Sequence, residues 1–121
     1  MAANSDVISV VYKMLPRAEW ERAVQAGFYA GSADDLRDGF VHLSAATQLA
    51  GTAAKYFHGQ SDLVLVAFRA EDLGPALKWE PSRGGELFPH FFSDLPADKA
   101  AAVYELPLGD DGVPLIPGGL L

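Results

Sequence analysis

Residues 63–68 constrain the fold of this chain most strongly, because the segment is short and entirely apolar. Val64 and Val66 within it are β-branched, and such side chains favour an extended backbone. A short apolar run that follows a polar turn, here residues 59–62, is typical of a strand buried on both faces. We therefore expect a sheet in which residues 63–68 form a central strand.

Shorter segments around this strand predict a small α+β fold. Further strands are expected at residues 7–14, 40–43, 77–80, 87–92 and 102–106, and helices at residues 17–24 and 45 to about 57. Residues 31–39 are rich in Gly, Ser and Asp and predict a surface loop. The run of short strands favours a sheet that is mostly antiparallel or split, with short flanking helices.

The length of 121 residues leaves room for one hydrophobic core. We therefore expect a single domain over residues 1–121, with its core at about 7–107. The tail at 108–121 contains several prolines and glycines and is expected to be irregular.

Charge and cysteine content limit the partners and the chemistry. Sixteen acidic and nine basic residues give a net charge of −7, which repels nucleic-acid backbones and anionic membranes. A pocket can still bind one nucleotide, because a few placed basic groups decide that. The lack of cysteine excludes disulfides, zinc-thiolate sites and thiol nucleophiles. Without an apolar run of about 20 residues, we expect a cytoplasmic protein with no membrane and no extended nucleic-acid partner.

His42 is the first candidate for chemistry, because it interrupts the apolar run at residues 40–43. Ser44 follows it and is a typical cap for the next helix. The imidazole would then lie near a helix N-terminus, where backbone N–H groups favour anions. The alternative is a core histidine that is hydrogen-bonded to a backbone carbonyl.

A hairpin around Gly84 and Gly85 is the second candidate site. It would pair residues 78–81 with 88–92 and bring Trp79, Glu80 and His90 close together. Because side chains alternate along a strand, Phe88 and His90 should share one face, and Glu80 should pair with His90. We expect Trp79, Glu80 and His90 to line the same cleft as His42. The alternative is a hairpin whose aromatic residues belong to the core.

The sequence lacks the motifs that would indicate a metal site, a serine nucleophile or a common nucleotide-binding fold. The potential metal ligands His42, His58, His90, Glu80 and Glu86 show no short ligand spacing, so no metal is expected. No Ser stands in a G-x-S-x-G elbow, and no Walker or Rossmann glycine pattern occurs. The common nucleotide-binding folds are therefore disfavoured.

Several of these motifs together resemble a known bacterial family. They are the run Asp38-Gly39-Phe40-Val41-His42-Leu43-Ser44, Gln48, the segment 63–68, Lys78-Trp79-Glu80 and Phe88-Pro89-His90. The chain is similar to the domain of unknown function 952 from about residue 10 to residue 106. This resemblance implies a fold similar to that of ADP-ribosyltransferases, in which a split sheet binds NAD in a cleft between its halves.

The segment His42-Leu43-Ser44 also resembles the His-Leu-Ser of RNA 2′-phosphotransferases, which use NAD to remove a phosphate. The resemblance implies that His42 contacts a ribose or phosphate of NAD and that Ser44 caps the helix behind it. Those enzymes hold phosphates with several arginines. Here Lys13 and Arg83 are the nearest candidates for that role.

Two functions of different class follow from these observations. The first is an NAD- or nucleotide-dependent transferase, with His42, Glu80 and His90 as catalytic residues and with a ligand held by Ser44, Lys13, Trp79, Arg83 and Phe88. The second is a non-catalytic module that keeps the cleft and binds a small molecule or a partner protein. The sequence leaves the substrate and the oligomeric state open.

Overall fold

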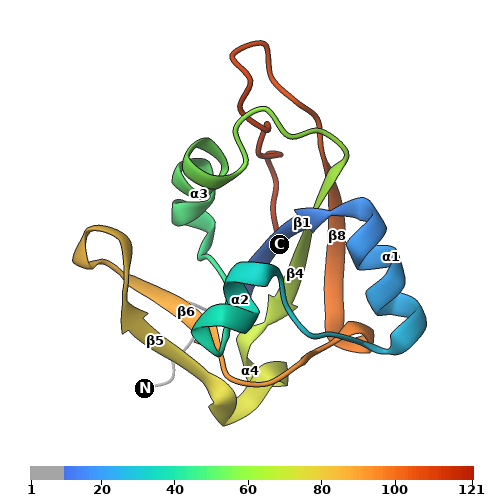
Figure 1. The fold of residues 1–121 in the computed structure, drawn as a ribbon, viewed down its shortest axis with the longest axis vertical. Helices are drawn as coiled ribbons and strands as arrows, with labels where there is room; N and C mark the ends of the chain where they lie inside the picture. Colours follow the sequence, from blue (N-terminus) through green and yellow to red (C-terminus); the bar gives the residue numbers. More distant parts are fainter. Residues whose placement is uncertain (1–9) are drawn as a thin grey trace.

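The strands of the chain form three antiparallel sheets in the part that the structure, a computed structural model, describes, residues 10–121 (Figure 1). The first sheet has the order β1-β4-β8, with β1 at Val10–Pro16, β4 at Leu63–Arg69 and β8 at Ala100–Leu106. The second has the order β3-β6-β5, with β3 at Val41–His42, β6 at Leu87–Phe91 and β5 at Leu77–Pro81. The third pairs β2, Phe28–Tyr29, with β7, Leu95–Pro96.

The predicted central strand is confirmed as β4, which lies between β1 and β8. Its side chains alternate between two core clusters, one on each face of the sheet. Val64, Val66 and Phe68 belong to the first cluster, and Leu63, Leu65 and Ala67 belong to the second. Burial on both faces is the reason why this strand is continuously apolar.

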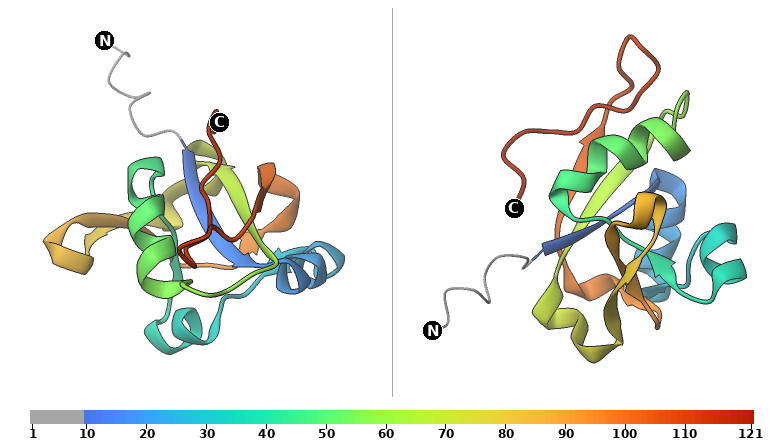
Figure 2. Two further views of the ribbon diagram at one scale, coloured as in Figure 1. Left: turned by 90° about the horizontal axis from the view of Figure 1, so that it is seen from above. Right: turned by 90° about the vertical axis from the view of Figure 1, so that its left-hand side faces the viewer.

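Helices cover both faces of the first sheet. They are α1 at Arg17–Ala26, α2 at Ala33–Asp38, α3 at Leu49–Tyr56 and α4 at Ala70–Leu73, with short 3₁₀ turns at Ala46–Gln48, Gly74–Ala76, Arg83–Gly85 and Ala97–Lys99. Helix α1 packs into the first core cluster and α3 into the second, so the two helices lie on opposite sides of the β1-β4-β8 sheet (Figure 2). Between residues 10 and 121, no helix is long and apolar enough to cross a membrane.

The surface loop predicted at residues 31–39 is wrong, because α2 occupies most of that segment. Ser32 and Asp35 form a capping box, in which each side chain accepts a hydrogen bond from the other residue's backbone N–H. Gly39 ends the helix in a left-handed conformation with φ of 87°. The polar and glycine residues that suggested a loop are therefore the two caps of a short helix.

Other boundaries differ by a few residues from the sequence-based expectation. The first strand was expected at 7–14; residues 7–9 lie outside the described part, and β1 continues to Pro16. The helix expected at 45–57 begins as the 3₁₀ turn Ala46–Gln48 and continues as α3. The tail carries no helix or strand, yet Val113, Ile116 and Leu120 pack against the second core cluster.

Because β4 is the central strand, a mutation that truncates one of its buried side chains should strongly lower the stability of the fold. Phe68→Ala should lower the free energy of unfolding by about 3–5 kcal/mol, because Phe68 is fully buried and its removal leaves a cavity. Val103→Ala on the neighbouring strand β8 is the control and should cost less than about 1 kcal/mol, since Val103 is 49% exposed. Urea unfolding of both variants measures the difference. Equal losses would contradict the assignment of β4 as the central strand.

Candidate functional site

His42 and His90 face each other across two paired strands. They are direct partners in the register of β3 and β6, and their ring centroids are 5.6 Å apart. The ring of Phe40 stacks on that of His90 with 4.0 Å between centroids and lies 4.6 Å from that of His42. The sheet therefore brings together the two histidines that the sequence singled out.

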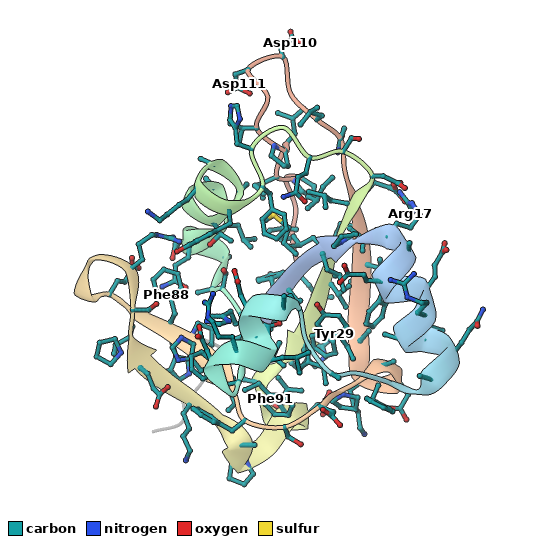
Figure 3. All side chains as sticks on the ribbon, in the orientation of Figure 1. Arg17, Tyr29, Phe88, Phe91, Asp110 and Asp111 are labelled. Atoms are coloured by element: carbon teal, nitrogen blue, oxygen red, sulfur yellow. The ribbon has the colours of Figure 1, made fainter. Side chains whose placement is uncertain are left out.

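A pocket of about 270 Å³ opens beside this pair of histidines. Its walls come from β1, α2, β3, α3 and the β5-β6 hairpin. The lining residues are Tyr12, Lys13, Met14, Ser32, Asp34, Asp35, Arg37, Asp38, His42, Leu43, Ser44, Thr52, Tyr56, Phe57, Ser82, Arg83, Phe88 and His90. Phe88 of β6 points toward α3 and lines the pocket, whereas Phe91 of the same strand does not line it (Figure 3). The predicted ligand residues Lys13, Ser44, Arg83 and Phe88 thus share one pocket with both histidines.

The carboxylate of Asp35 is the buried centre of the site. Its Oδ2 accepts hydrogen bonds from Lys13 Nζ at 2.8 Å and from the Ser32 backbone N–H at 2.9 Å. Its Oδ1 accepts one from the His42 backbone N–H at 3.0 Å and lies 2.6 Å from His42 Nδ1. Four polar groups from β1, β3 and the start of α2 therefore converge on one carboxylate.

Burial alone would raise the pKa of Asp35, because it disfavours the charged form. The hydrogen bond to His42, the charge and hydrogen bond of Lys13 and the bond from Ser32 act in the opposite direction. Together they outweigh burial and hold the pKa of Asp35 well below its usual range. Asp35 is thus a fixed negative charge that neutralises the buried Lys13.

His42 has a carboxylate at each ring nitrogen. Nδ1 meets Asp35, and Nε2 lies 3.0 Å from Asp38 Oδ2. Two acceptors suit an imidazolium, which has two N–H donors. The ring is partly open to solvent, with 35% of its side chain exposed. His42 is therefore held as a hydrogen-bond donor at the edge of the pocket, and neither of its ring nitrogens is free.

His90 has a different environment, with one partner and one unpaired nitrogen. Nδ1 lies 2.8 Å from Glu80 Oε1, and a carboxylate can only accept there, so Nδ1 carries the proton. Nε2 is buried and has no hydrogen-bond partner among residues 10–121. In the neutral ring Nε2 then holds a lone pair, which makes it a proton acceptor. A carboxylate that fixes a histidine in this tautomer is the arrangement found in catalytic dyads and triads.

The expectation that Trp79 lines the cleft is wrong. In the register of β5 and β6, Glu80 pairs with Phe88 and Lys78 with His90, so those four residues share one face. Trp79 points to the opposite face and packs against the first core cluster. Glu80 lies on the same face of the sheet as His90 and contacts it, but Glu80 does not line the pocket itself.

Ser44 does not cap the following helix, contrary to the expectation. Its hydroxyl bonds to Thr52 Oγ1 at 3.1 Å, inside the pocket. The Ala45 backbone N–H at the start of the 3₁₀ turn donates instead to Gln48 Oε1. Gln48 therefore satisfies the N–H at the start of the turn, which is the role of the glutamine in a capping box.

The sequence-based reasoning missed Asp35, Asp38, Phe40 and Tyr56 as site residues. The two aspartates fell in the segment predicted to be a loop. The spacing of Ser32 and Asp35 could have identified α2, because a capping-box pattern marks a helix start. No sequence signal pointed to Phe40 as the ring that stacks on His90.

Comparisons with known proteins identify relatives of this fold. Residues 14–103 match the family described as "Protein of unknown function (DUF952)". The crystal structure of protein CC0527 from Caulobacter crescentus is 51% identical, with a TM-score of 0.86 over 88% of this chain and 94% of that chain. The solution NMR structure of CC0527 is 52% identical, with a TM-score of 0.79 over 87% of this chain and 90% of that chain. No curated protein matches the sequence significantly.

Removal of the Asp35 charge should lower the stability of the fold. Asp35→Asn should lower the free energy of unfolding by about 3–5 kcal/mol, because it leaves the ammonium of Lys13 buried without a counter-charge. Asp34→Asn is the matched control in the same helix turn and should cost less than about 1 kcal/mol, since its pair with Arg37 is exposed. Chemical unfolding at neutral pH measures both. A loss at Asp35 no larger than that at Asp34 would contradict the network.

The lowered pKa of Asp35 also predicts an acid transition. A carboxyl group whose pKa is lower in the folded state stabilises the fold above its unfolded pKa, which is about 3.9 for Asp. This contribution should be complete above about pH 5 and should decrease as the pH falls below about 4. Unfolding free energies measured from pH 6 to pH 2.5 should decrease less steeply in Asp35→Asn than in the wild type. Parallel profiles would show that Asp35 is not the group responsible.

Proposed function

The chain belongs to the DUF952 family of proteins of unknown function, and we propose that it is a nucleotide-dependent transferase, with NAD as the candidate cosubstrate. The observation that carries the proposal is the Glu80–His90 pair. Its outer nitrogen, Nε2, has no partner among the described residues, and His90 lines the pocket. A buried polar atom without a partner is uncommon in folded proteins, and a catalytic role is one explanation for it.

The roles of the two histidines follow from their partners. His90 would accept a proton at Nε2 from a hydroxyl of the substrate, while Glu80 holds Nδ1–H and stabilises the imidazolium that forms. His42 has both ring nitrogens bound to carboxylates and would orient the ligand by the contact of its ring at the wall of the pocket. The proton would later leave from His90 Nε2, which restores the neutral ring.

The side chains of the pocket fit a nucleotide. Arg83 offers a cation for a phosphate, Ser44 offers a hydroxyl for a ribose, and the rings of Tyr56 and Phe88 support the Arg83 guanidinium. When bound, NAD would supply the ADP-ribosyl group that is transferred to the substrate hydroxyl, with nicotinamide as the leaving group. The volume of about 270 Å³ lies at the lower end of the range for ligand pockets, so we expect it to enclose one nucleotide half of a dinucleotide.

A non-catalytic binding module is the second candidate, and a specific observation favours it. Four of the five basic side chains in the pocket already have carboxylate partners: Lys13, Arg37, His42 and His90. A site in which most charges are neutralised internally can hold a ligand without reacting with it. Binding without turnover would identify this function.

The following experiment tests the proposed transferase. NAD and ADP-ribose should raise the melting temperature of the wild type, because a ligand that binds only the folded state stabilises it. Incubation with NAD should release nicotinamide, and His90→Gln should slow the release by about 10²–10⁴-fold while the ligand-induced stabilisation persists. His58→Gln, which alters a histidine outside the pocket, is the control and should leave the rate unchanged. Stabilisation of the wild type without release would favour the binding module, and no stabilisation by either ligand would contradict the NAD-dependent transferase.

A further inference from the structure

We propose that Arg83 forms an anion subsite in this pocket and selects ligands that carry a phosphate group, and that the missing side chain of Gly51 is what admits the guanidinium. The proposal rests on the proposed function only in placing the ligand in the same pocket. It adds the chemical class of the ligand and names two residues that determine it.

The guanidinium of Arg83 is held between two aromatic rings. Arg83 begins the 3₁₀ turn at the tip of the β5-β6 hairpin. Its Cζ lies 4.7 Å from the ring centroid of Phe88, on β6, and 5.8 Å from that of Tyr56, on α3. Stacking on aromatic faces orients a planar guanidinium while leaving the N–H groups at its edge available. The group therefore spans the hairpin and the helix in a defined position.

Arg83 differs from the other basic side chains of the pocket in having no acidic partner. Lys13 is paired with Asp35, and Arg37 is paired with Asp34. Within residues 10–121, no hydrogen bond or ion pair involves the Arg83 side chain. Its five N–H donors are therefore free to bind a ligand.

The two acids nearest to Arg83 along the chain, Glu80 and Glu86, have other partners, and that of Glu80 is His90. Glu86 lies three residues after Arg83, and its Oε2 accepts a hydrogen bond at 3.0 Å from Gln48 Nε2. The same amide nitrogen also donates to the Leu87 backbone carbonyl at 2.8 Å. Gln48 thus anchors the strand end at Leu87 and holds one oxygen of the Glu86 carboxylate, and among residues 10–121 no ion pair joins Glu86 to Arg83.

Gly51 provides the space for the guanidinium. A Cβ placed on Gly51 would lie 3.1 Å from Arg83 Nη2, closer than most real contacts of a Cβ atom. Gly51 lies inside α3 with no positive φ, so the backbone conformation does not require glycine there. Glycine inside a helix costs about 1 kcal/mol relative to alanine. An alanine at this position would require the Arg83 guanidinium to move away by a few tenths of an ångström.

A phosphate group matches these features better than a neutral group does. A guanidinium binds phosphate oxygens through two parallel N–H donors, and such charge-assisted bonds are roughly twice as strong as neutral ones. The hydroxyls of Ser44, Thr52 and Ser82 line the same pocket. Ser44 and Thr52 are hydrogen-bonded to each other, so one of these two hydroxyls and that of Ser82 can donate to further phosphate oxygens. The net charge of −7 disfavours a long polyanion, so the subsite suits a single phosphate or a mononucleotide.

Binding of three probes tests the subsite. We expect AMP to bind at least about tenfold more tightly than adenosine, measured by calorimetry. Inorganic phosphate alone should shift the amide NMR resonances of residues 51 and 83–85, which separates the phosphate contribution from that of the nucleoside. Arg83→Gln should weaken AMP binding by about tenfold or more and leave adenosine unaffected. The control is Arg69→Gln, which alters an exposed arginine outside the pocket. Unchanged AMP binding in Arg83→Gln would overturn the proposal.

Gly51→Ala gives a second test that retains the arginine. The variant should raise the melting temperature, because alanine is the better helix former, and should weaken AMP binding several-fold, because its Cβ displaces the guanidinium. Ala50→Gly, at an exposed neighbouring position of the same helix, should do the reverse: a lower melting temperature with unchanged AMP binding. A Gly51→Ala variant that binds AMP as the wild type does would overturn the role of Gly51.

These measurements separate the subsite from the proposed function. If AMP binding depends on Arg83 but NAD yields no nicotinamide, the phosphate subsite stands and the transferase falls. If nicotinamide release persists in Arg83→Gln with an unchanged KM for NAD, the transferase stands and the phosphate subsite falls.

Discussion

The buried carboxylate of Asp35 fixes the relative positions of three elements around the pocket. It binds the Lys13 ammonium from β1, the Ser32 backbone at the start of α2 and the His42 backbone on β3. Helix α2 has only six residues and β3 only two, although backbone hydrogen bonds between Tyr12 and Ser44 also join β1 to the segment after β3. A short helix and a two-residue strand bury little surface, so a charge-assisted network has to hold them in place.

That network also sets the difference between the two histidines. They occupy paired positions on β3 and β6, and pairing across a sheet points both rings to the same face. The two acidic partners of His42 both come from α2. The single acidic partner of His90 comes from β5, which pairs with β6 on the side away from β3. The different chemistry of two like side chains thus follows from which element lies beside each ring.

The sequence predicts those parts of the fold that depend on local pattern. Residues 63–68 were recognisable because burial on both faces requires an unbroken apolar strand, and Phe88 and His90 share a face because side chains alternate. The same alternation excludes a common face for Trp79 and Glu80, which are adjacent, and the expectation for Trp79 neglected this. Helix α2 was missed because Ser, Asp and Gly serve equally as turn formers and as helix caps. The partners of Asp35 depend on contacts between residues 22 and 7 positions apart, which no local pattern records.

Gly51 has an effect on the pocket that its helix propensity does not indicate. In the sequence it only weakens a predicted helix, and propensity alone would favour alanine there. In the fold its Cα faces the guanidinium of Arg83, a residue 32 positions later in the chain at the tip of another element. A local cost in helix stability is therefore tied to the placement of a distant charge. Because the aromatic rings of Tyr56 and Phe88 flank that charge, the hairpin tip and α3 must keep their separation for the pocket to retain its shape.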